Sequence, residues 1–424
     1  MSLPFFGQFG WEAVVLAIEP QCSNAVLEKE LIDTVPHEVK VVRTKAISNS
    51  ISAPFGINNV GLRALPFLYR SGARILAGQQ FDLIYFSTTM FPVMALARLW
   101  WKQFSIPYIL DMQDPWVTDY YDAKPASERP PKYWLSQRLN KSLEAWTMPR
   151  VGGLIAVSER YHRELRERYP NIRQSLCRTI PFGAAASDHV LAERTACNVD
   201  LLREPVWQQD GYWHGVYVGV LGRAMKFSCR VICEALRKGL AEHPALFSRV
   251  RLHFIGTDYA PAGAGRCTML PIAKDLGMEK YIDESPARIP YFAALRVLGR
   301  ADFLVVPGTD DPGYTASKIY PYILSKRPIV ALFHEKSSVV SVLRDTSAGE
   351  AVSFASEDDI DRVAGSFFTQ WKKILHRIPF QPATDWRAFQ PYTAEEMTRK
   401  QCELFDVVVD SEHGLTIRTG VAAA

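Results

Sequence analysis

The sequence predicts an α/β protein of two domains, each built around a parallel β-sheet. Short, almost wholly apolar runs alternate with longer helical patterns, as strands buried on both faces of a parallel sheet do. This alternation occurs twice and is broken at residues 177–189, CRTIPFGAAASDH, which we interpret as an interdomain hinge. The length of 424 residues also exceeds the usual size of a single hydrophobic core.

The first series predicts four buried strands that are bounded by turn or cap residues. They are AVVLAIEP (13–20), FDLIYFST (81–88), PYILDMQD (107–114) and GGLIAVSE (152–159). Helical patterns lie between them at 60–79, 90–104 and 131–147. Strands and helices in this order favour a doubly wound sheet with helices on both faces.

The second series repeats the arrangement after the hinge. Its predicted strands are GVYVGVLGR (215–223), RVRLHFIGT (249–257), DFLVVPGT (302–309) and RPIVALF (327–333). Helices are predicted at 227–242, 268–277, 290–300 and 318–326, with one long helix within 385–409. Because ligands of such sheets bind beyond the carboxyl ends of the strands, two facing sheets would form a cleft lined by the loops found there.

Composition limits the class of protein. A net charge of +4 and a pI near 8.6 exclude a strongly basic nucleic-acid binder, so we expect no nucleic acid as a partner. The seven cysteines are scattered without a C-x-x-C pair, which favours reduced thiols over a disulfide or zinc framework. No run approaches the about 18–20 apolar residues of a membrane span, and no secretory signal is apparent at the start. We therefore expect a cytoplasmic protein.

One region is locally basic. Between Lys124 and Arg178 there are 12 Lys or Arg residues and 5 Asp or Glu residues. Such an excess is typical of a solvated helical face, and it is also typical of a surface that contacts an anionic membrane or a lipid phosphate. Both interpretations stay open from composition alone.

The loop after the strand at 215–223 carries glycines followed by cations. Gly219 and Gly222 permit close approach of the backbone to a ligand, and Arg223 and Lys226 precede a helix. Two cations three residues apart at the start of a helix could clamp a diphosphate. Glycine-then-basic turns are also common without any ligand, and no P-loop motif occurs.

The stretch GTDDPGYTASKIYPYILSKRPIVALF, from 308, combines acids, hydroxyls and a lysine before an apolar run. Thr315 and Ser317 are natural helix caps, and Lys318 lies in the first turn, so backbone N–H groups and an ammonium would meet at an anion site. Pro321 indicates that the helix begins at Ser317 or later, because a deeper proline would bend it.

Two further acids, Asp310 and Asp311, precede this helix start. They could hold sugar hydroxyls or only solvate the loop, and the sequence does not decide between these roles.

Other candidates follow two further strands. Asp111 and Asp114 stand at the carboxyl end of a buried strand, where acids can serve as acid, base or metal ligand, although Asp114 before Pro115 could simply start a turn.

Ile289, before Pro290 at a helix start, could meet a planar ligand through its backbone. His162 is expected on the surface of the helix that Ser158 would cap.

Taken together, these residues resemble a family 4 glycosyltransferase of the two-Rossmann GT-B type, from about residue 10 to 410. The resemblance rests on the order and spacing of GWEAVVLAIEP, FDLIYFSTTMFPVMALA, IPYILDMQDPW, GLIAVSERYHRELRERYP, IPFGAAASD, YVGVLGR and ADFLVVPGTDDPGYTASKIYPYILSKRPIVAL. It implies transfer of a sugar from a nucleotide diphosphate donor to an acceptor, with retention and without a metal or other cofactor. It also implies an N-terminal acceptor domain, 1–184, a nucleotide-sugar domain, 185–385, and a segment, 386–424, whose helix crosses back to the first domain.

The resemblance implies roles for residues at matching positions. Arg223 and Lys226, with Gly222 in the same turn, match the pair that meets the donor diphosphate. Ser317 and Lys318 match the helix start that holds the same group.

Ile289 matches the nucleobase contact, and Asp114 matches an aspartate near the transferred sugar. We add Asp111 as a second catalytic candidate, and Asp310, Asp311 and Thr315 as contacts to the base or sugar.

The sequence departs from the family pattern in three places. The motif E-x-F-G-x-x-x-x-E would put its glutamates at Gly313 and Pro321, and a histidine expected before Asp114 is Gln113. The usual first strand with its glycine-rich loop is also missing before FFGQFGWEAVV.

We expect a glycosyltransferase that acts on a glycan or lipid-linked acceptor in polysaccharide or glycolipid biosynthesis, cytoplasmic and peripheral at the inner face of the plasma membrane. The alternatives are a GT-B protein that binds a sugar nucleotide without catalysis, and a GT-B sugar-nucleotide epimerase.

Overall fold

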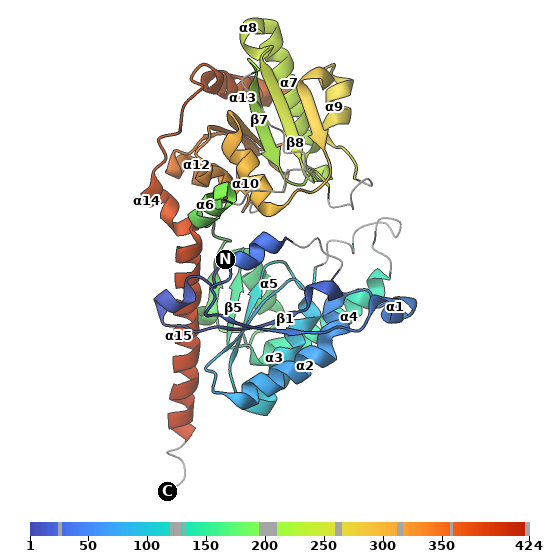
Figure 1. Cartoon of the computed structure of the whole chain (residues 1–424), viewed down its shortest axis with the longest axis vertical. Helices are drawn as coiled ribbons and strands as arrows, with labels where there is room; N and C mark the ends of the chain where they lie inside the picture. Colours follow the sequence, from blue (N-terminus) through green and yellow to red (C-terminus); the bar gives the residue numbers. More distant parts are fainter. Residues whose placement is uncertain are drawn as a thin grey trace. The chain divides into compact units, whose positions relative to one another are not determined.

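The computed structural model describes residues 1–23, 28–118, 122, 129, 132–194, 210–258, 265–311, 317–356 and 359–419. These form two compact units (Figure 1). The N-terminal unit comprises Met1–Phe182 together with Glu395–Ala424, and the central unit comprises Gly183–Ala394. The change from one unit to the other therefore falls within the stretch that we interpreted as a hinge. That stretch is not wholly irregular, because it holds a short strand and the first residues of a helix.

The N-terminal unit contains a four-stranded parallel sheet and a separate parallel pair. The four strands, in spatial order, are β3 (Ile84–Ser87), β4 (Tyr108–Met112), β5 (Gly153–Ala156) and β6 (Cys177–Thr179). The pair is β1 (Val14–Ile18) and β2 (Lys40–Thr44). Its helices are α1 (Asn49–Ser52), α2 (Val60–Gly78), α3 (Ala95–Phe104), α4 (Tyr133–Thr147), α5 (Glu159–Arg168) and α15 (Ala394–Thr419), the last of which begins at the boundary.

Side chains of β4 alternate between two apolar layers, because successive residues of a strand point to opposite faces. Tyr108 and Leu110 pack in the layer that includes Ala64 of α2 and Trp100 of α3. Ile109 packs in the other layer, against α15. Both faces of this sheet are therefore covered, which explains why its strands read as continuous apolar runs.

α15 lies close against the start of β5. A Cβ atom on Gly153 would stand 3.0 Å from a methyl carbon of Val408 and 3.2 Å from Ile109. The glycine pair before LIAV thus provides room for the last helix.

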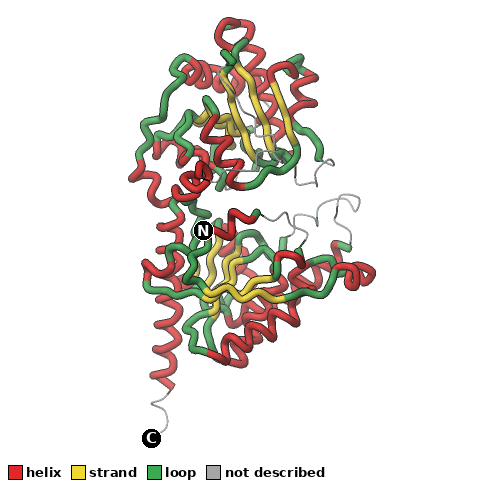
Figure 2. The backbone as a smooth tube through the Cα atoms, viewed as in Figure 1, coloured by secondary structure: helices red, strands yellow, loops and turns green. Residues whose placement is uncertain are grey.

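The central unit is built on a six-stranded parallel sheet flanked by helices (Figure 2). Its strands, in spatial order, are β12 (Glu350–Phe354), β11 (Ile329–His334), β10 (Phe303–Pro307), β7 (Trp213–Val218), β8 (Val250–Ile255) and β9 (Ile282–Ser285). Its helices are α6 (Ala186–Arg194), α7 (Lys226–Glu242), α8 (Pro244–Phe247), α9 (Met269–Asp275), α10 (Tyr291–Arg300), α11 (Ile319–Leu324), α12 (Ser338–Thr346), α13 (Ile360–Leu375) and α14 (Trp386–Phe389).

The strand order reverses between β7 and β10. From β7 the chain proceeds outward to β8 and β9, and from β10 it proceeds the other way to β11 and β12. The loops after β7 and β10 therefore leave the sheet at its topological switch point, where doubly wound sheets bind ligands.

All eight predicted strands correspond to strands of the structure, with ends that differ by up to five residues. Of the strands within the described residues, β2, β6, β9 and β12 are not predicted. Three of them lie at the edge of a sheet, and the fourth belongs to the two-stranded pair. Such strands need fewer apolar residues, and IDES of β9 has one, so the apolar-run signal is weak there. Within the described part of the chain, no helix is both long and apolar enough to cross a membrane.

Candidate functional site

The turn after β7 forms one side of the candidate site in the central unit. Gly219 has a φ of +145°, which side chains disfavour, and Gly222 is exposed before a 3₁₀ helix at Arg223–Met225. A Cβ atom on Gly219 would stand 2.9 Å from Lys318 Nζ, whereas one on Gly222 would meet no described atom within 4 Å. Glycine at 219 therefore allows Lys318 to approach, and Gly222 leaves space beside the turn.

Lys318 is held over the aromatic ring of Tyr217 at the end of β7. Its Nζ donates a 2.7 Å hydrogen bond to Tyr217 Oη and lies 5.0 Å from the centre of the ring. Burial lowers the pKa of Lys318 to about 8, because desolvation disfavours the charged ammonium. No carboxylate of the described residues pairs with this ammonium. An anion placed beside it would favour the charged form.

The helix after Lys318 begins later than a cap at Ser317 would require. α11 starts at Ile319, so Lys318 occupies the N-cap position, and no described side chain caps the helix. Capping by the Ser317 hydroxyl is thus wrong. Instead, the Ser317 carbonyl accepts a 3.2 Å bond from Tyr320 N–H. Pro321 is the third helical residue, in the first turn, where its missing N–H removes no intrahelical bond. The prediction that the helix begins at Ser317 or later is confirmed.

Hydrogen bonds tie the loop after β10 to the loop after β7. Asp310 N–H donates to Ala224 O at 3.1 Å, and Ser228 Oγ of α7 donates to Gly308 O at 2.8 Å. Tyr322 Oη of α11 accepts from Val218 N–H at 2.7 Å. Residues 80 to 104 positions apart in the sequence therefore meet at the switch point of the sheet.

Arg223 and Lys226 are exposed at this edge. Within the described part of the chain, neither side chain makes a hydrogen bond or an ion pair. The two cations that were predicted to meet a diphosphate are thus available to a ligand. Their role stays a prediction.

The other residues predicted in this unit have different surroundings. Asp310 and Asp311 are exposed, and Ser317 is half-buried. Ile289 is half-buried against the core, after β9 and just before Pro290, which is the N-cap of α10. It lies at the carboxyl edge but two strand positions from β7. Thr315 lies outside the described residues.

Sequence reasoning missed three polar groups at this edge. Tyr217 and Tyr322 are buried aromatic residues within apolar segments, where they are indistinguishable from ordinary core residues. Thr309 is only 8% exposed, and its Oγ1 has no hydrogen-bond partner in the described structure. Burial of a hydroxyl group without a hydrogen bond costs free energy of folding. The sequence alone does not show whether such a group has a partner.

In the N-terminal unit, Asp111 is buried in a network of hydroxyl groups. Its Oδ2 accepts hydrogen bonds from Tyr85 Oη at 2.8 Å and from Ser87 Oγ at 2.9 Å. Gln401 of α15 donates to Tyr85 Oη at 3.3 Å. Burial raises the pKa of Asp111, and the hydrogen bonds from Tyr85 and Ser87 oppose that rise. The carboxylate thus links β3, β4 and α15.

Asp114 lies three residues further on and differs from Asp111. It is exposed after β4, and no hydrogen bond to its side chain is present within the described structure. Partial burial raises the pKa of its carboxyl group. Among the described residues, no group of three or more His, Cys, Asp or Glu side chains is placed to hold a metal ion. Asp114 stays a predicted catalytic residue, with an oxygen pair open to a ligand.

The expectation of a surface position for His162 is wrong. His162 is buried on α5, its Nε2 lies 2.8 Å from Arg178 O, and its Nδ1 is buried without a partner in the described residues. Burial lowers the pKa of the imidazole. The helix turns this position towards β6, a strand that the sequence analysis did not predict.

A family model described as a glycosyl transferase 4-like domain matches residues 8–183. The match covers less than half of the 424 residues. The match confirms the resemblance, and it covers β1–β6 and the strand end that carries Asp111 and Asp114. Comparison with curated protein sequences finds no significant match.

Solved structures confirm the GT-B fold. The N-terminal domain of trehalose-6-phosphate phosphatase from Candida albicans is 12% identical, with a TM-score of 0.58, and the match covers 96% of this chain and 93% of that one. The α,α-trehalose 6-phosphate synthase of Burkholderia multivorans is 11% identical, with a TM-score of 0.54, over 96% of this chain and 100% of that one. Anabaena HepE, solved in complex with UDP, is 12% identical, with a TM-score of 0.50, over 96% of this chain and 100% of that one. Residues 8–183 thus match a glycosyltransferase domain, and the solved structures show the fold that the whole chain shares with them.

Proposed function

We propose that this glycosyltransferase transfers a sugar from a nucleotide diphosphate sugar to a glycan or lipid-linked acceptor, with retention at the anomeric carbon. The reaction would belong to polysaccharide or glycolipid biosynthesis. The proposal assigns the donor to the central unit and the acceptor to the N-terminal unit.

The surroundings of Lys318 carry the proposal. A desolvated ammonium, which no carboxylate of the described residues pairs with, stands against the Gly219 turn, at the switch point of a doubly wound sheet. Arg223 and Lys226 follow the same turn, exposed and without a protein partner in the described residues. A departing nucleoside diphosphate gains negative charge in the transition state, and cations fixed in advance stabilise that charge.

The nucleotide is proposed from one similar structure and from the resemblance of the sequence. HepE, which shares the fold, was solved in complex with UDP. We propose a nucleoside diphosphate as the leaving group in this chain as well, with the base near Ile289 and the sugar near Asp310 and Asp311.

Asp114 is the proposed catalytic carboxylate of the acceptor unit, because it is exposed at a strand end and has no protein partner among the described residues. Asp111 is proposed to position this strand end through Tyr85 and Ser87 and not to touch the substrate. We propose that the three cations perform the task that a metal performs in other transferases. The proposed location is the cytoplasmic face of the membrane.

A thermal-shift screen tests the donor site. We expect one or more nucleotide diphosphate sugars, or free UDP, to raise the melting temperature of the full chain, because a ligand of the folded state stabilises it. The variant Lys318→Ala should lose this shift, whereas Lys336→Ala, an exposed lysine elsewhere in the same unit, should keep it. An unchanged shift in Lys318→Ala would refute the phosphate assignment.

One observation favours a second function, the binding of a sugar nucleotide without catalysis. The family pattern that the sequence resembles would put its two glutamates at Gly313 and Pro321, and this chain has neither acid. Transfer or hydrolysis assays with the ligand found in the screen separate the two functions. Ligand binding without turnover would favour the binding protein.

A further inference from the structure

Large apolar side chains project into solvent from two neighbouring parts of the N-terminal unit. Ile51 in α1 is 63% exposed, and Phe55 just after this helix is 77% exposed. Trp134 on α4 is 70% exposed. Leu135 and Leu139 extend this surface along α4. Their spacing of four residues puts them on one side of the helix. Single exposed apolar residues are common, but a group of this kind marks an interaction surface.

The two parts lie side by side. α1 is next to α4 in the N-terminal unit (Figure 1), and a Cβ atom on Gly56 would stand within 2.2 Å of Lys132 Nζ, just before α4. We call the surface formed by Ile51, Phe55, Trp134, Leu135 and Leu139 the α1–α4 face.

Cations border the α1–α4 face. α4 carries Arg138 and Lys141 on its exposed side, whereas its acid, Glu144, is buried and paired with Arg168 at 3.1 Å. The guanidinium of Arg98 and the ammonium of Lys102 lie 4.3 and 4.4 Å from the ring centre of Trp146, at the end of the same helix.

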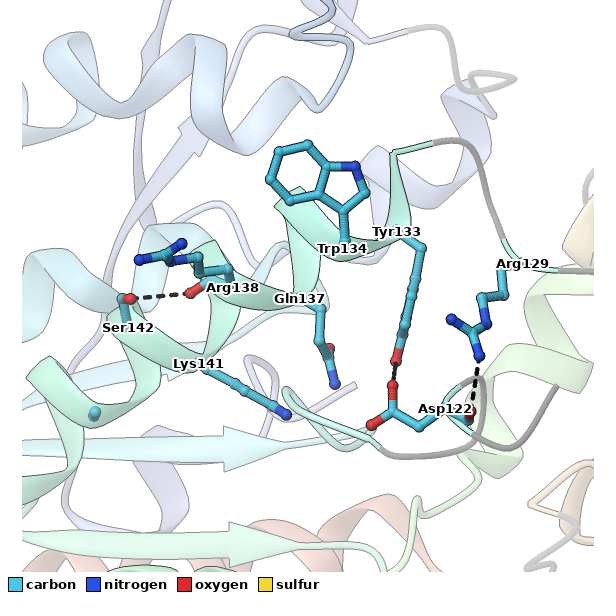
Figure 3. Close-up of a pocket in the computed structure, with 9 residues that line it drawn as sticks. Asp122, Arg129, Tyr133, Trp134, Gln137, Arg138, Lys141 and Ser142 are labelled. Carbon is cyan, nitrogen blue, oxygen red and sulfur yellow. Dashed lines mark hydrogen bonds between the residues drawn. The ribbon is translucent and has the colours of Figure 1, made fainter. Parts of the chain in front are cut away.

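An open hollow of about 540 Å³ lies against α4 and is lined by residues that include Trp134, Arg138 and Lys141. Figure 3 shows Lys141, Gln137 and Tyr133 extending from the helix towards Asp122, whose carboxylate accepts a 2.8 Å hydrogen bond from Tyr133 Oη. The carboxylate of Asp122 at the hollow is thus hydrogen-bonded to Tyr133, and Arg138 and Lys141 of α4 line the same space.

We propose that the α1–α4 face docks on an anionic lipid bilayer, with Phe55 and Trp134 entering the headgroup region and Arg138 and Lys141 contacting lipid phosphates. Aromatic side chains favour the membrane interface, and basic residues beside them are attracted to anionic headgroups. The basic border favours a membrane over a second copy of the chain, because two copies of one basic face would repel each other.

The inference rests on the proposed lipid-linked acceptor, because docking of this kind would bring the acceptor unit to the surface where such a substrate lies. It does not depend on the donor site, which belongs to the other unit.

Vesicle flotation with the full chain tests the proposal. We expect binding to vesicles of phosphatidylcholine and phosphatidylglycerol at low salt, weaker binding at moderate salt, and little binding to pure phosphatidylcholine. The double variant Arg138→Gln/Lys141→Gln should weaken binding about 25-fold at low salt, from about fivefold for each cation near an anionic surface. The double variant Phe55→Ser/Trp134→Ser should weaken it by on the order of tenfold or more, because two apolar anchors are lost.

Matched variants in the central unit serve as controls. Arg230→Gln/Lys238→Gln removes the same charge from exposed positions of α7, and Val190→Ser removes an exposed apolar side chain from α6; both should bind vesicles as the unchanged chain does. Melting temperatures of all variants, and their shift with a nucleotide ligand, should be unchanged. A lost nucleotide shift with intact vesicle binding would count against the proposed function alone.

Three results would overturn the inference. The first is an absence of binding to anionic vesicles at low salt, and the second is equal binding by the two face variants and their controls. The third is self-association, seen by light scattering, that Phe55→Ser/Trp134→Ser abolishes while vesicle binding is absent or unaffected.

Discussion

A charged side chain lies near the carboxyl edge of each sheet, and its hydrogen-bond partners differ between the two units. In the central unit, Lys318 is half-buried and desolvated, and among the described residues its ammonium bonds to the hydroxyl group of Tyr217 and to no carboxylate. In the N-terminal unit, Asp111 is buried, and two hydroxyl groups donate to its carboxylate. A buried carboxylate that accepts hydrogen bonds from neighbouring strands fixes their positions. A desolvated ammonium without a counter-charge can instead bind an anionic ligand. The comparison separates positioning residues from binding residues.

The largest effect should come from the exposed acid, Asp114. Replacing it with asparagine removes the charge with little change of shape, so we expect kcat to fall by about 10² to 10⁴, the range for a lost catalytic acid or base. The melting temperature should stay the same, since no described side chain bonds to this carboxylate. Steady-state kinetics of sugar transfer provide the measurement. Full activity in Asp114→Asn would remove it from the catalytic residues.

Loss of the desolvated Lys318 ammonium should have the next largest effect. We expect Lys318→Met to raise the dissociation constant of the nucleotide ligand by about tenfold to a hundredfold, the range for a lost charge-assisted hydrogen bond. Isothermal titration calorimetry measures this change. Arg223→Gln, an exposed cation of the same site, should cost less than Lys318→Met, because solvent screens its charge. A larger loss in Arg223→Gln than in Lys318→Met would mean that burial does not strengthen the contact with the ligand.

The lowered pKa of Lys318 predicts a pH dependence of donor binding. The anion binds the protonated ammonium, whose pKa is about 8 in the free protein, and the bound anion raises that pKa. Binding is therefore strongest below pH 8 and weakens as the pH rises through 8, by about tenfold between pH 7 and pH 9. Titrations across this range should show the change, and Lys318→Met should be nearly independent of pH. A flat profile in the unchanged chain would be inconsistent with the assignment.

The smallest effect is expected at the satisfied acid, Asp111. Asparagine weakens the hydrogen bonds that Tyr85 and Ser87 donate, and removal of the desolvated charge offsets part of this loss, so we expect Asp111→Asn to lower the free energy of unfolding by about 1 kcal/mol. Denaturant unfolding measures this, with Asp114→Asn as the matched control that leaves stability unchanged. Comparable destabilisation by both variants would mean that the two acids do not differ as their surroundings indicate.

Periodicity in the sequence predicts the central strands well and the edge strands poorly. β10 is a continuous apolar run and β4 is apolar except for Asp111, because both of their faces are buried, whereas β9 has one apolar residue in four. The candidate site divides in the same way. Gly219, Arg223 and Lys318 are recognisable as glycine and cations near element ends, but the buried surroundings of Lys318 depend on Tyr217 and Tyr322, which look like core residues in the sequence.

The sequence by itself determines two α/β halves, the strands of both sheet centres and the edge at which we propose that ligands bind, because these follow from local pattern and from the direction of parallel strands. Only the tertiary structure separates Asp111 from Asp114 and Lys318 from Arg223. Each pair shares its chemistry in the sequence, and burial and hydrogen-bond partners arise from segments distant in the chain, such as Gln401 of α15 beside Tyr85. These long-range contacts set the pKa of each group, and therefore what it can bind.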